Sequence, residues 1–277
     1  MSVPSFAAVG RLKLAVITGG ASGIGLAGAR AFARAGMRVV LVDRPGDNLL
    51  RAAASIPDST ALSVDIADRA AVFELARTVT ASFGPVSVLM NNAGIGSGGD
   101  VFADPTAWDE VLGVNLFGVL HGVQAFVPAM IDSSSPALVI NTGSKQGITQ
   151  PPGNTAYNVS KAGVKSLTEG LAHSLRERTG KRVSAHLLVP GFTFTGMTAR
   201  NRREKPAAAW TPEQVVALMM ERIAFGDFYI LCPDNETTSE QDAKRIAWAA
   251  GDVIENRPAL SRWHPEWQDA FAHFMQA

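Results

Sequence analysis

Residues Leu12–Gly25 read LKLAVITGGASGIG, an apolar run that leads directly into a glycine-rich turn. The apolar half ends at Thr18, and its aliphatic and β-branched residues predict a buried strand. The turn has the spacing T-G-x-x-x-G-x-G, and a helical pattern over Ile24–Arg34 follows it. The stretch therefore predicts a strand–turn–helix unit of the kind found in doubly wound α/β folds.

The glycine-rich turn is a candidate site for a dinucleotide. Glycines at a strand-to-helix turn let the backbone approach a pyrophosphate closely, and free amides at the helix start attract its negative charge. A turn of this kind can also be purely structural, but its place after the first strand favours the nucleotide site. The residues expected to contact the cofactor here are Thr18, Gly19, Ser22, Gly23, Ile24 and Gly25.

Outward from this unit, short apolar runs alternate with longer helical patterns. The predicted strands are Leu12–Thr18, Arg38–Val42, Ala61–Val64, Val86–Met90, Ala137–Asn141, Val183–Val189 and Phe228–Leu231. The predicted helices include Ile24–Arg34, Arg69–Ser82, Ala107–Phe126, Thr155–Arg178 and Pro212–Ala224. Asp68 and Thr211 precede two of these helices as natural N-caps. Apolar strands separated by helices predict a doubly wound, Rossmann-type α/β fold with a parallel sheet covered on both faces.

The composition excludes several classes of protein. The 277 residues carry 25 basic and 25 acidic side chains and one cysteine, Cys232. A zero net charge argues against a general nucleic-acid binder, which needs a basic excess. One cysteine cannot form an internal disulfide, and no Cys/His spacing resembles a zinc site, so we expect no metal. With no secretory signal at the N-terminus, we expect a cytoplasmic protein. Its single domain has a core over about residues 11–232 and a helical extension over about residues 233–277.

One stretch invites a membrane interpretation. Residues Val111–Ile131 contain no charged side chain and are long enough to cross a bilayer. They also contain Asn115, His121, Gln124 and Pro128, and polar groups at this density are costly in lipid. We therefore expect a helix that is buried in the protein or at a subunit contact, and no membrane span.

Asp43 ends the second predicted strand, at about the 20-residue distance from the glycines where an acidic residue can bind the adenosine ribose hydroxyls. Its carboxylate would repel a 2′-phosphate, which favours NAD over NADP. Arg44 introduces the alternative, because a guanidinium there can pair with that phosphate. We expect the carboxylate to dominate and predict NAD as the cofactor.

Tyr157 and Lys161 lie four residues apart near the start of the predicted helix Thr155–Arg178, so their side chains share one helix face. A phenol titrates at about 10 in water, and an adjacent ammonium moves its pKa toward the working range. Ser144 follows the fifth predicted strand and can hold a substrate oxygen from the opposite side. A Tyr–x–x–x–Lys pair is also common on helix surfaces, so the surrounding motifs must support this interpretation.

Taken together, these motifs resemble the short-chain dehydrogenase/reductase family in its single-domain form. The matching segments, in the family's order, are Thr18–Gly25, Asp65, Asn91–Gly94, Asn115, Ser144, Tyr157 with Lys161, Pro190–Gly191 and Thr195. The resemblance implies a seven-stranded parallel sheet and hydride transfer between a nicotinamide and a small-molecule alcohol or ketone. It also implies a homodimer or homotetramer, formed through the long helices after the fourth and fifth strands.

The resemblance further implies a role for each matching residue. Tyr157 would be the acid/base, and Lys161 would lower its pKa and bind the nicotinamide ribose. Ser144 would orient the substrate oxygen, and Asn115 would hold a water molecule in a proton relay. The other implied cofactor contacts are Asp65 and Ile66 at the adenine, Asn91, Ala93 and Gly94 beneath it, and Pro190, Gly191, Thr193 and Thr195 at the carboxamide.

Substrate recognition is expected from less regular segments, where Gln146 and Asn154 accompany Ser144 and Tyr157. The segment Gly196–Ala209 would form a mobile lid. Its basic residues either attract an anionic substrate or form a solvated face. They are Arg200, Arg202, Arg203 and Lys205.

The C-terminal extension departs from the family pattern. It contains a predicted helix, Ser239–Glu255, followed by the aromatic residues Trp263, Trp267, Phe271 and Phe274. The last three form one helix face, which either packs against the body or a partner subunit, or caps the substrate pocket.

Two alternatives to an NAD-dependent dehydrogenase stay open. The first is an NADP-dependent ketone reductase, for which Arg44 is the discriminating residue. The second is a non-catalytic, nucleotide-sensing regulator on the same fold. Such a regulator would be expected to lack Tyr157, Lys161 or Ser144, and all three are present.

Overall fold

A computed structural model describes residues 4–96, 98–199 and 202–276 of the chain. Seven strands form one sheet in the order β3-β2-β1-β4-β5-β6-β7, and each neighbouring pair is parallel. The strands are β1 Leu14–Thr18, β2 Arg38–Asp43, β3 Ser59–Ser63, β4 Val86–Asn91, β5 Ala137–Thr142, β6 Val183–Val189 and β7 Tyr229–Leu231. The strand order reverses between β1 and β4, which is where parallel sheets of this kind bind ligands. The predicted doubly wound, seven-stranded parallel sheet is therefore confirmed.

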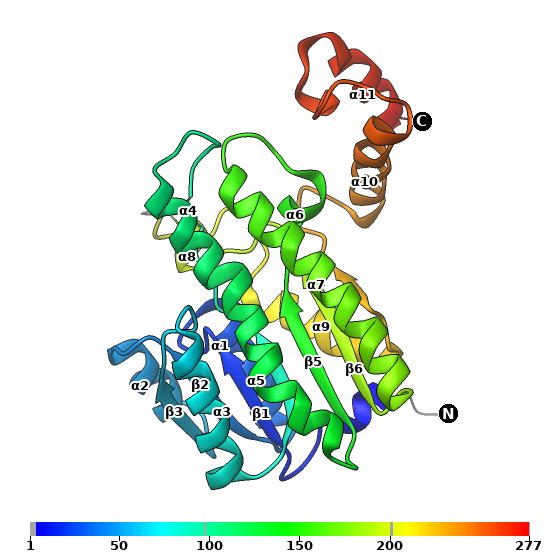
Figure 1. Cartoon of the computed structure of the whole chain (residues 1–277). Helices are drawn as coiled ribbons and strands as arrows, with labels where there is room; N and C mark the ends of the chain where they lie inside the picture. Colours follow the sequence, from blue (N-terminus) through cyan, green and yellow to red (C-terminus); the bar gives the residue numbers. More distant parts are fainter. Residues whose placement is uncertain (1–3, 97, 200–201, 277) are drawn as a thin grey trace.

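Helices cover both faces of this sheet (Figure 1). The α-helices are α1 Gly23–Arg34, α2 Asp47–Ala54, α3 Arg69–Phe83, α4 Pro105–Leu112, α5 Gly118–Asp132, α6 Gln146–Thr149, α7 Thr155–Thr179, α8 Gly196–Ala199, α9 Pro212–Phe225, α10 Ser239–Ile254 and α11 Gln268–Gln276. Short 3-10 turns lie at Pro4–Ala8, Ser261–Trp263 and Pro265–Trp267. The helix α2 is short and was not among the predicted ones.

The central strand β1 illustrates why the strands of this sheet consist almost entirely of apolar residues. Ala15 and Ile17 belong to the core cluster that contains residues of α1 and α9, whereas Leu14 and Val16 belong to the cluster that contains residues of α3 and α5. Because side chains alternate along a strand, a sheet covered on both faces needs an apolar residue at every position. All four of these β1 residues are fully buried.

The predicted helix caps are confirmed. Asp68 accepts a hydrogen bond from the amide of Ala71 at the start of α3. Thr211 forms a capping box with Gln214 at the start of α9. These caps satisfy amides that have no partner within the helix, and they set where each helix begins.

The uncharged stretch Val111–Ile131 makes up most of one long helical segment, Pro105–Asp132, which by length and composition alone could span a membrane. In the structure α5 packs against β4 and α3, and its buried side chains include Val119, Phe126 and Met130. The apolar character of α5 is therefore explained by packing on the sheet. A π-helical turn, Gly113–Phe117, joins α4 to α5 and carries Asn115.

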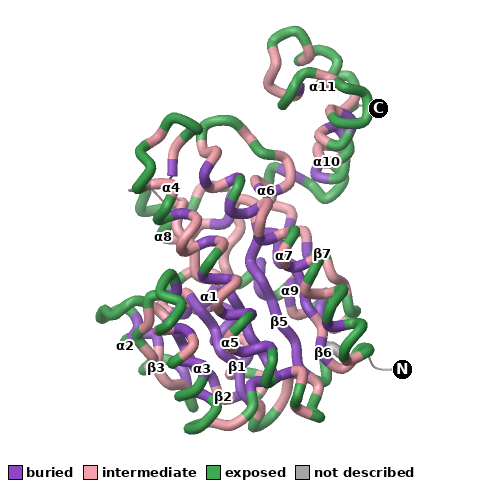
Figure 2. Tube along the Cα trace, viewed as in Figure 1, coloured by how far each residue is buried: buried purple, intermediate pink, exposed green. Residues whose placement is uncertain are grey.

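The C-terminal extension projects beyond the carboxyl ends of the strands, and most of its residues are exposed or half-buried (Figures 1 and 2). Its aromatic residues pack around Trp248 of α10, whose ring lies 5.3 Å from that of Phe271 and 5.2 Å from that of Phe274. The guanidinium of Arg257 lies over the Trp248 ring, 4.0 Å from the ring centroid. The aromatic face therefore packs within the extension and not against the body, whereas contact with a partner subunit and capping of the substrate pocket stay predictions.

Two glycines in long helices should respond oppositely to alanine. A methyl group at Gly122 in α5 would lie 2.2 Å from Oδ1 of Asn91, so Gly122→Ala should lower the free energy of unfolding by about 1–3 kcal/mol. Gly170 in α7 has open space around it, so Gly170→Ala should raise this free energy by roughly 0.5–1 kcal/mol. Thermal or urea unfolding of both variants checks this, and equal stabilities would contradict the close packing of α5 on β4.

Candidate active site

The glycine-rich turn between β1 and α1 packs closely against the turn that follows β4. A methyl group at Gly25 would lie 2.1 Å from the carbonyl oxygen of Gly19 and 2.7 Å from Nδ2 of Asn92. Gly19 has a φ of +66°, and a methyl group there would lie 2.8 Å from Cα of Ala93. Neither Gly19 nor Gly25 therefore has room for a side chain at its position.

The start of α1 fits the predicted pyrophosphate site. Ser22 is the N-cap residue, but its side chain does not cap the helix. The first amides of α1 therefore have no side-chain acceptor from this residue, and the helix dipole adds a partial positive charge there. A phosphate group is the ligand that suits such a helix start.

Thr18 and Asn91 hold the neighbouring strand ends together. The hydroxyl oxygen of Thr18 accepts hydrogen bonds from the amides of Asn92 at 3.0 Å and Ala93 at 3.2 Å. The Asn91 side chain is buried and donates to Asn141, which in turn donates to Thr168 in α7. Thr18 thus lies beside the glycine turn as predicted, whereas the Asn91 side chain points into the interior and not toward the predicted adenine site.

Asp43 lies at the end of β2, beside the glycine turn. Its carboxylate accepts hydrogen bonds from the amides of Ala21 at 3.1 Å and Arg44 at 2.9 Å. Asp43, Ser22 and Arg44 line one open cavity. A carboxylate that could bind ribose hydroxyls and a guanidinium that could pair with a 2′-phosphate therefore border the same space.

Asp65 and Ile66 lie between β3 and α3. The Asp65 carboxylate is exposed and accepts a hydrogen bond from the amide of Ala67. The Ile66 side chain is buried against Gly118 of α5, and its carbonyl lies 3.0 Å from Nδ1 of His121. This packing anchors the segment, so that Asp65 and the backbone of Ile66 remain as candidate contacts for an adenine.

Tyr157 and Lys161 come together with Ser144 at the carboxyl ends of the central strands. The Ser144 side chain hydrogen-bonds the Tyr157 phenol. The Lys161 ammonium donates to the carbonyl oxygen of Thr142 at 2.8 Å and lies 5.8 Å from the centroid of the Tyr157 ring. A phenol, a hydroxyl and an ammonium thus converge where β5 ends and α7 begins.

The pKa values of this group follow from burial. Burial raises the pKa of the Tyr157 phenol above its ordinary value, and the hydrogen bond to Ser144 opposes this with a smaller effect. Burial also lowers the pKa of the Lys161 ammonium to about 8. The expectation that Lys161 places the Tyr157 pKa below its ordinary value is therefore not met by these residues alone, because desolvation of the phenolate outweighs the favourable contacts.

Asn115 is fully buried in the π-helical turn. Its side-chain oxygen accepts from the amide of Ile95 at 2.8 Å, and its side-chain amide donates to the Ile95 carbonyl at 2.9 Å and to the Ser160 hydroxyl at 3.2 Å. The side chain therefore fixes the loop after β4 against α7. Gly94 lies between this side chain and the ammonium of Lys161.

The segment after β6 folds back over the glycine turn. Thr195 lies against Gly23, and Met197 lies against Gly96. Thr193 is buried, and its carbonyl accepts a hydrogen bond from the Thr198 hydroxyl. The predicted contacts Pro190, Gly191, Thr193 and Thr195 therefore lie in one continuous segment between β6 and α8.

The remaining predicted residues, which belong to the substrate site and the lid, lie in different surroundings. The amide of Gln146 donates to the Ser144 hydroxyl, and the side chain of Asn154 donates to the carbonyl of Gly96. Gln146 therefore lies beside Ser144, and Asn154 lies at the start of α7 against the loop that follows β4. Arg202, Arg203 and Lys205 are exposed, and Arg200 lies outside the described residues.

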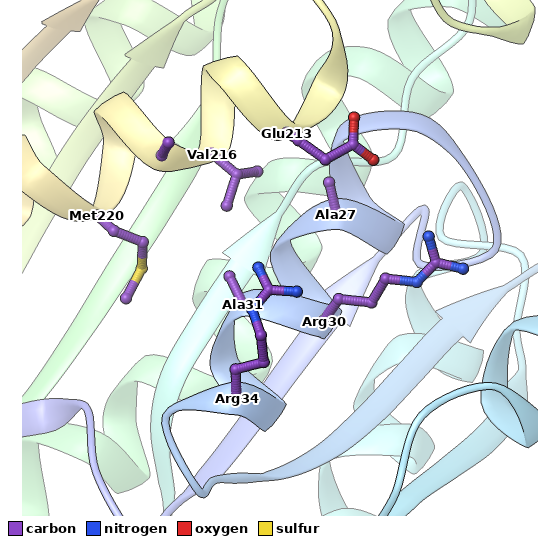
Figure 3. Close-up of a pocket in the computed structure, with 8 residues that line it drawn as sticks. Ala27, Arg30, Ala31, Arg34, Glu213, Val216 and Met220 are labelled. Atoms are coloured by element: carbon purple, nitrogen blue, oxygen red, sulfur yellow. The ribbon is translucent and has the colours of Figure 1, made fainter.

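A second groove lies between α1 and α9 (Figure 3). Arg30 and Arg34 of α1 and Glu213 and Met220 of α9 are among the residues that line it. None of the predicted catalytic or cofactor residues lines this groove, so it is not part of the candidate site.

Asp234 and Asp242 escaped the sequence analysis, which placed Lys145 only within the stretch Lys145–Ile148 that is expected to line the reacting end. Lys145 forms ion pairs with Asp234 and Asp242, directly beside Ser144. The only sequence signal is a lysine that follows the predicted substrate-orienting serine. Its partners lie about 90 residues away along the chain, in an extension without a recognised motif.

Comparisons with known proteins agree with this geometry. The sequence profile of the short chain dehydrogenase family matches residues 13–206. A 1-deoxy-11-beta-hydroxypentalenate dehydrogenase of Streptomyces exfoliatus is 35% identical over 261 residues, which cover 91% of this chain and 94% of that protein.

Two solved structures are also similar. A short chain dehydrogenase/reductase from Burkholderia phymatum in complex with NAD has a TM-score of 0.80 at 33% identity, covering 90% of this chain and 96% of that one. A metagenomic short-chain oxidoreductase in complex with NADP has a TM-score of 0.68 at 28% identity, covering 81% of this chain and 98% of that one.

The fold, the glycine turn and the profile match lead to one family. The profile covers the segment from β1 through the loop that follows α8, which includes each residue of the candidate catalytic group. Relatives that align over most of this chain are named as dehydrogenases or reductases. The chain therefore belongs to the short-chain dehydrogenase/reductase family and is an oxidoreductase that acts on CH–OH groups.

Proposed function

We propose that the protein is an NAD-dependent dehydrogenase that interconverts a secondary alcohol and a ketone. The observation that carries the proposal is the convergence of Tyr157, Ser144 and Lys161 at the carboxyl ends of the strands, beside the glycine turn. A bound nicotinamide supplies the chemistry of accepting a hydride from the alcohol carbon or donating one to the carbonyl carbon.

Tyr157 moves the proton that accompanies this transfer. In alcohol oxidation the phenolate oxygen takes the hydroxyl proton of the substrate, and in ketone reduction the phenol returns it. The Ser144 hydroxyl, which already hydrogen-bonds the Tyr157 phenol, orients the substrate oxygen. Gln146 and Asn154 flank this position and are proposed to contact the rest of the substrate.

Lys161 has two tasks in this proposal. Its positive charge favours the phenolate form of Tyr157, and its position between Thr142 and Gly94 suits a hydrogen bond to the nicotinamide ribose. Asn115 has both ends of its side chain engaged with Ile95 and Ser160. Any relay water must therefore be held by the main chain of its π-helical turn, and its side chain acts by fixing the loop after β4.

The cofactor preference rests on Asp43. Relatives of this family bind either NAD or NADP, so the choice depends on the residues around the adenosine ribose. The Asp43 carboxylate is held toward the glycine turn by the amide of Ala21, where it would accept ribose hydroxyl bonds and repel a 2′-phosphate. The runner-up is NADP, supported by Arg44 at the rim of the same cavity.

The wider organisation is also a proposal. Residues 11–232 are proposed to form one Rossmann-type domain, with residues 233–277 as its helical extension. A cytoplasmic homodimer or homotetramer is proposed through the exposed sides of α5 and α7. The oligomer is supported by two exposed apolar residues, Phe117 at the end of the π-helical turn before α5 and Val159 on α7.

The direct test is a screen for NADH formation, followed by fluorescence, with secondary alcohols of steroid, aryl, sugar and hydroxy-acid types. Turnover of one class with NAD would support the proposed function. Failure of every class with both NAD and NADP would count against it.

Tyr157→Phe should lower kcat by about a hundred- to ten-thousandfold, because it removes the group that transfers the proton. NADH affinity should stay nearly unchanged. Tyr229→Phe is the matched control, because Tyr229 is the other of the two tyrosines and is exposed, with its hydroxyl bonded to Glu169. Steady-state kinetics of both variants test the assignment, and an active Tyr157→Phe enzyme would remove Tyr157 from this role.

The rate of alcohol oxidation should rise with pH, since it requires the phenolate of Tyr157, whose pKa burial raises. Ketone reduction should fall with pH, since it requires the phenol. Lys161→Met removes a positive charge that favours the phenolate, so the rise should move to higher pH at saturating NAD. Lys165→Met, one turn further along α7, is the control. A flat wild-type profile in both directions would contradict the proposal.

Asp43→Ala should raise the KM for NAD by about tenfold, because the ribose loses a charge-assisted hydrogen bond, and it should lower the KM for NADP. Asp47→Ala is the matched control, since Asp47 lines the same cavity with an exposed carboxylate. A wild-type KM for NADP at or below that for NAD would show that Asp43 does not set the preference.

A further inference from the structure

Lys145 follows Ser144 directly and is largely shielded from solvent. Its ammonium lies 2.6 Å from Oδ2 of Asp242 and 3.4 Å from Oδ2 of Asp234. The side chains of Asp242 and Asp234 are only 5% and 8% exposed. Charges this far out of water are stable only when they are paired, so each of the three groups constrains the position of the others.

These residues come from three separate parts of the chain. Lys145 lies between β5 and α6, Asp234 follows β7, and Asp242 lies near the start of α10 in the C-terminal extension. The helices α10 and α6 are in contact, and Figure 1 shows α10 beside α6 at the carboxyl ends of the strands. The extension thus meets the body at the loop that carries Ser144.

Asp234 connects this network to the loop after β6. Its Oδ2 atom accepts a hydrogen bond from the amide of Phe192 at 3.3 Å. A methyl group at Gly191 would lie 2.8 Å from the Lys145 ammonium and 2.9 Å from Oδ2 of Asp234, so the loop backbone is pressed onto the ion pair. Burial disfavours the charged carboxylate, but the Phe192 amide and Lys145 together hold the pKa of Asp234 below its ordinary value.

We propose that Lys145, Asp234 and Asp242 are positioning residues that set the Ser144 loop and the Gly191–Phe192 loop relative to each other. The C-terminal extension, through Asp242, is thereby part of the active-site architecture. This proposal rests on the proposed function, in which the loop after β6 holds the carboxamide end of the cofactor and Ser144 holds the substrate.

The physical argument predicts which half of the cofactor is affected. The adenosine and pyrophosphate half is assigned to the glycine turn and Asp43, and neither is among the contacts of the network. The nicotinamide half is assigned to the loop at Gly191. Loosening the network should therefore weaken binding of the whole dinucleotide and leave binding of a fragment without nicotinamide unchanged.

The test compares NADH with ADP-ribose as probes on the full-length protein. Asp242→Asn keeps the Lys145–Asp234 pair and the shape of the network, and Lys145→Met removes the shared cation. Glu240→Gln is the matched control, since Glu240 lies on α10 with an 81% exposed side chain and pairs with Lys244 one turn along the same helix. NADH binding is measured by fluorescence, ADP-ribose binding by calorimetry, and folding of each variant by its Tm.

Asp242→Asn and Lys145→Met should each weaken NADH binding by about tenfold, the effect expected from one or two misplaced hydrogen bonds. The Kd for ADP-ribose should stay within about twofold of wild type. Glu240→Gln should change neither. A Tm loss with unchanged NADH binding, or equal losses for both probes, would overturn the positioning role. A wild-type protein that binds neither probe would overturn the proposed function itself.

Discussion

The contact between the glycine turn after β1 and the Asn92–Ala93 turn after β4 constrains the rest of the site. The two backbones approach so closely that a methyl group at Gly25 would lie 2.1 Å from a carbonyl oxygen. Thr18 fastens the same contact by accepting hydrogen bonds from both amides of the second turn. This contact lies where the strand order reverses, so α1 begins there with its amides turned toward the space in which a dinucleotide fits.

The candidate catalytic residues lie just after β5 and at the start of α7, and their proton affinities depend on burial. Lys161 is buried and Tyr157 is half-buried, and burial disfavours the charged form of each side chain. Their protonation is therefore sensitive to every charge that comes near, which suits groups that must gain and lose protons during a reaction. The buried Asn115 side chain hydrogen-bonds Ile95 in the loop after β4 and Ser160 in α7, and it thereby fixes this loop against the helix.

The extension adds a second level of organisation. Its small aromatic core around Trp248 makes it a compact unit that needs little contact with the body. The charged contact that it does make, from Asp242 to Lys145, reaches the loop beside Ser144. The C-terminal extension is thus connected by buried ion pairs to the loops around the candidate active site.

The sequence by itself determined the parallel sheet, the helix caps at Asp68 and Thr211, and the residues that gather around the glycine turn. These features depend on local periodicity and turn chemistry, which are written in neighbouring residues. It failed where a side chain's partner lies far along the chain. The amide of Asn91 turned inward to Asn141, the aromatic residues of the extension packed on Trp248, and the balance of effects on the Tyr157 pKa favoured burial. The pairing of Lys145 with Asp234 and Asp242 was decided by the tertiary structure alone, because only folding brings groups about 90 residues apart to within hydrogen-bonding distance.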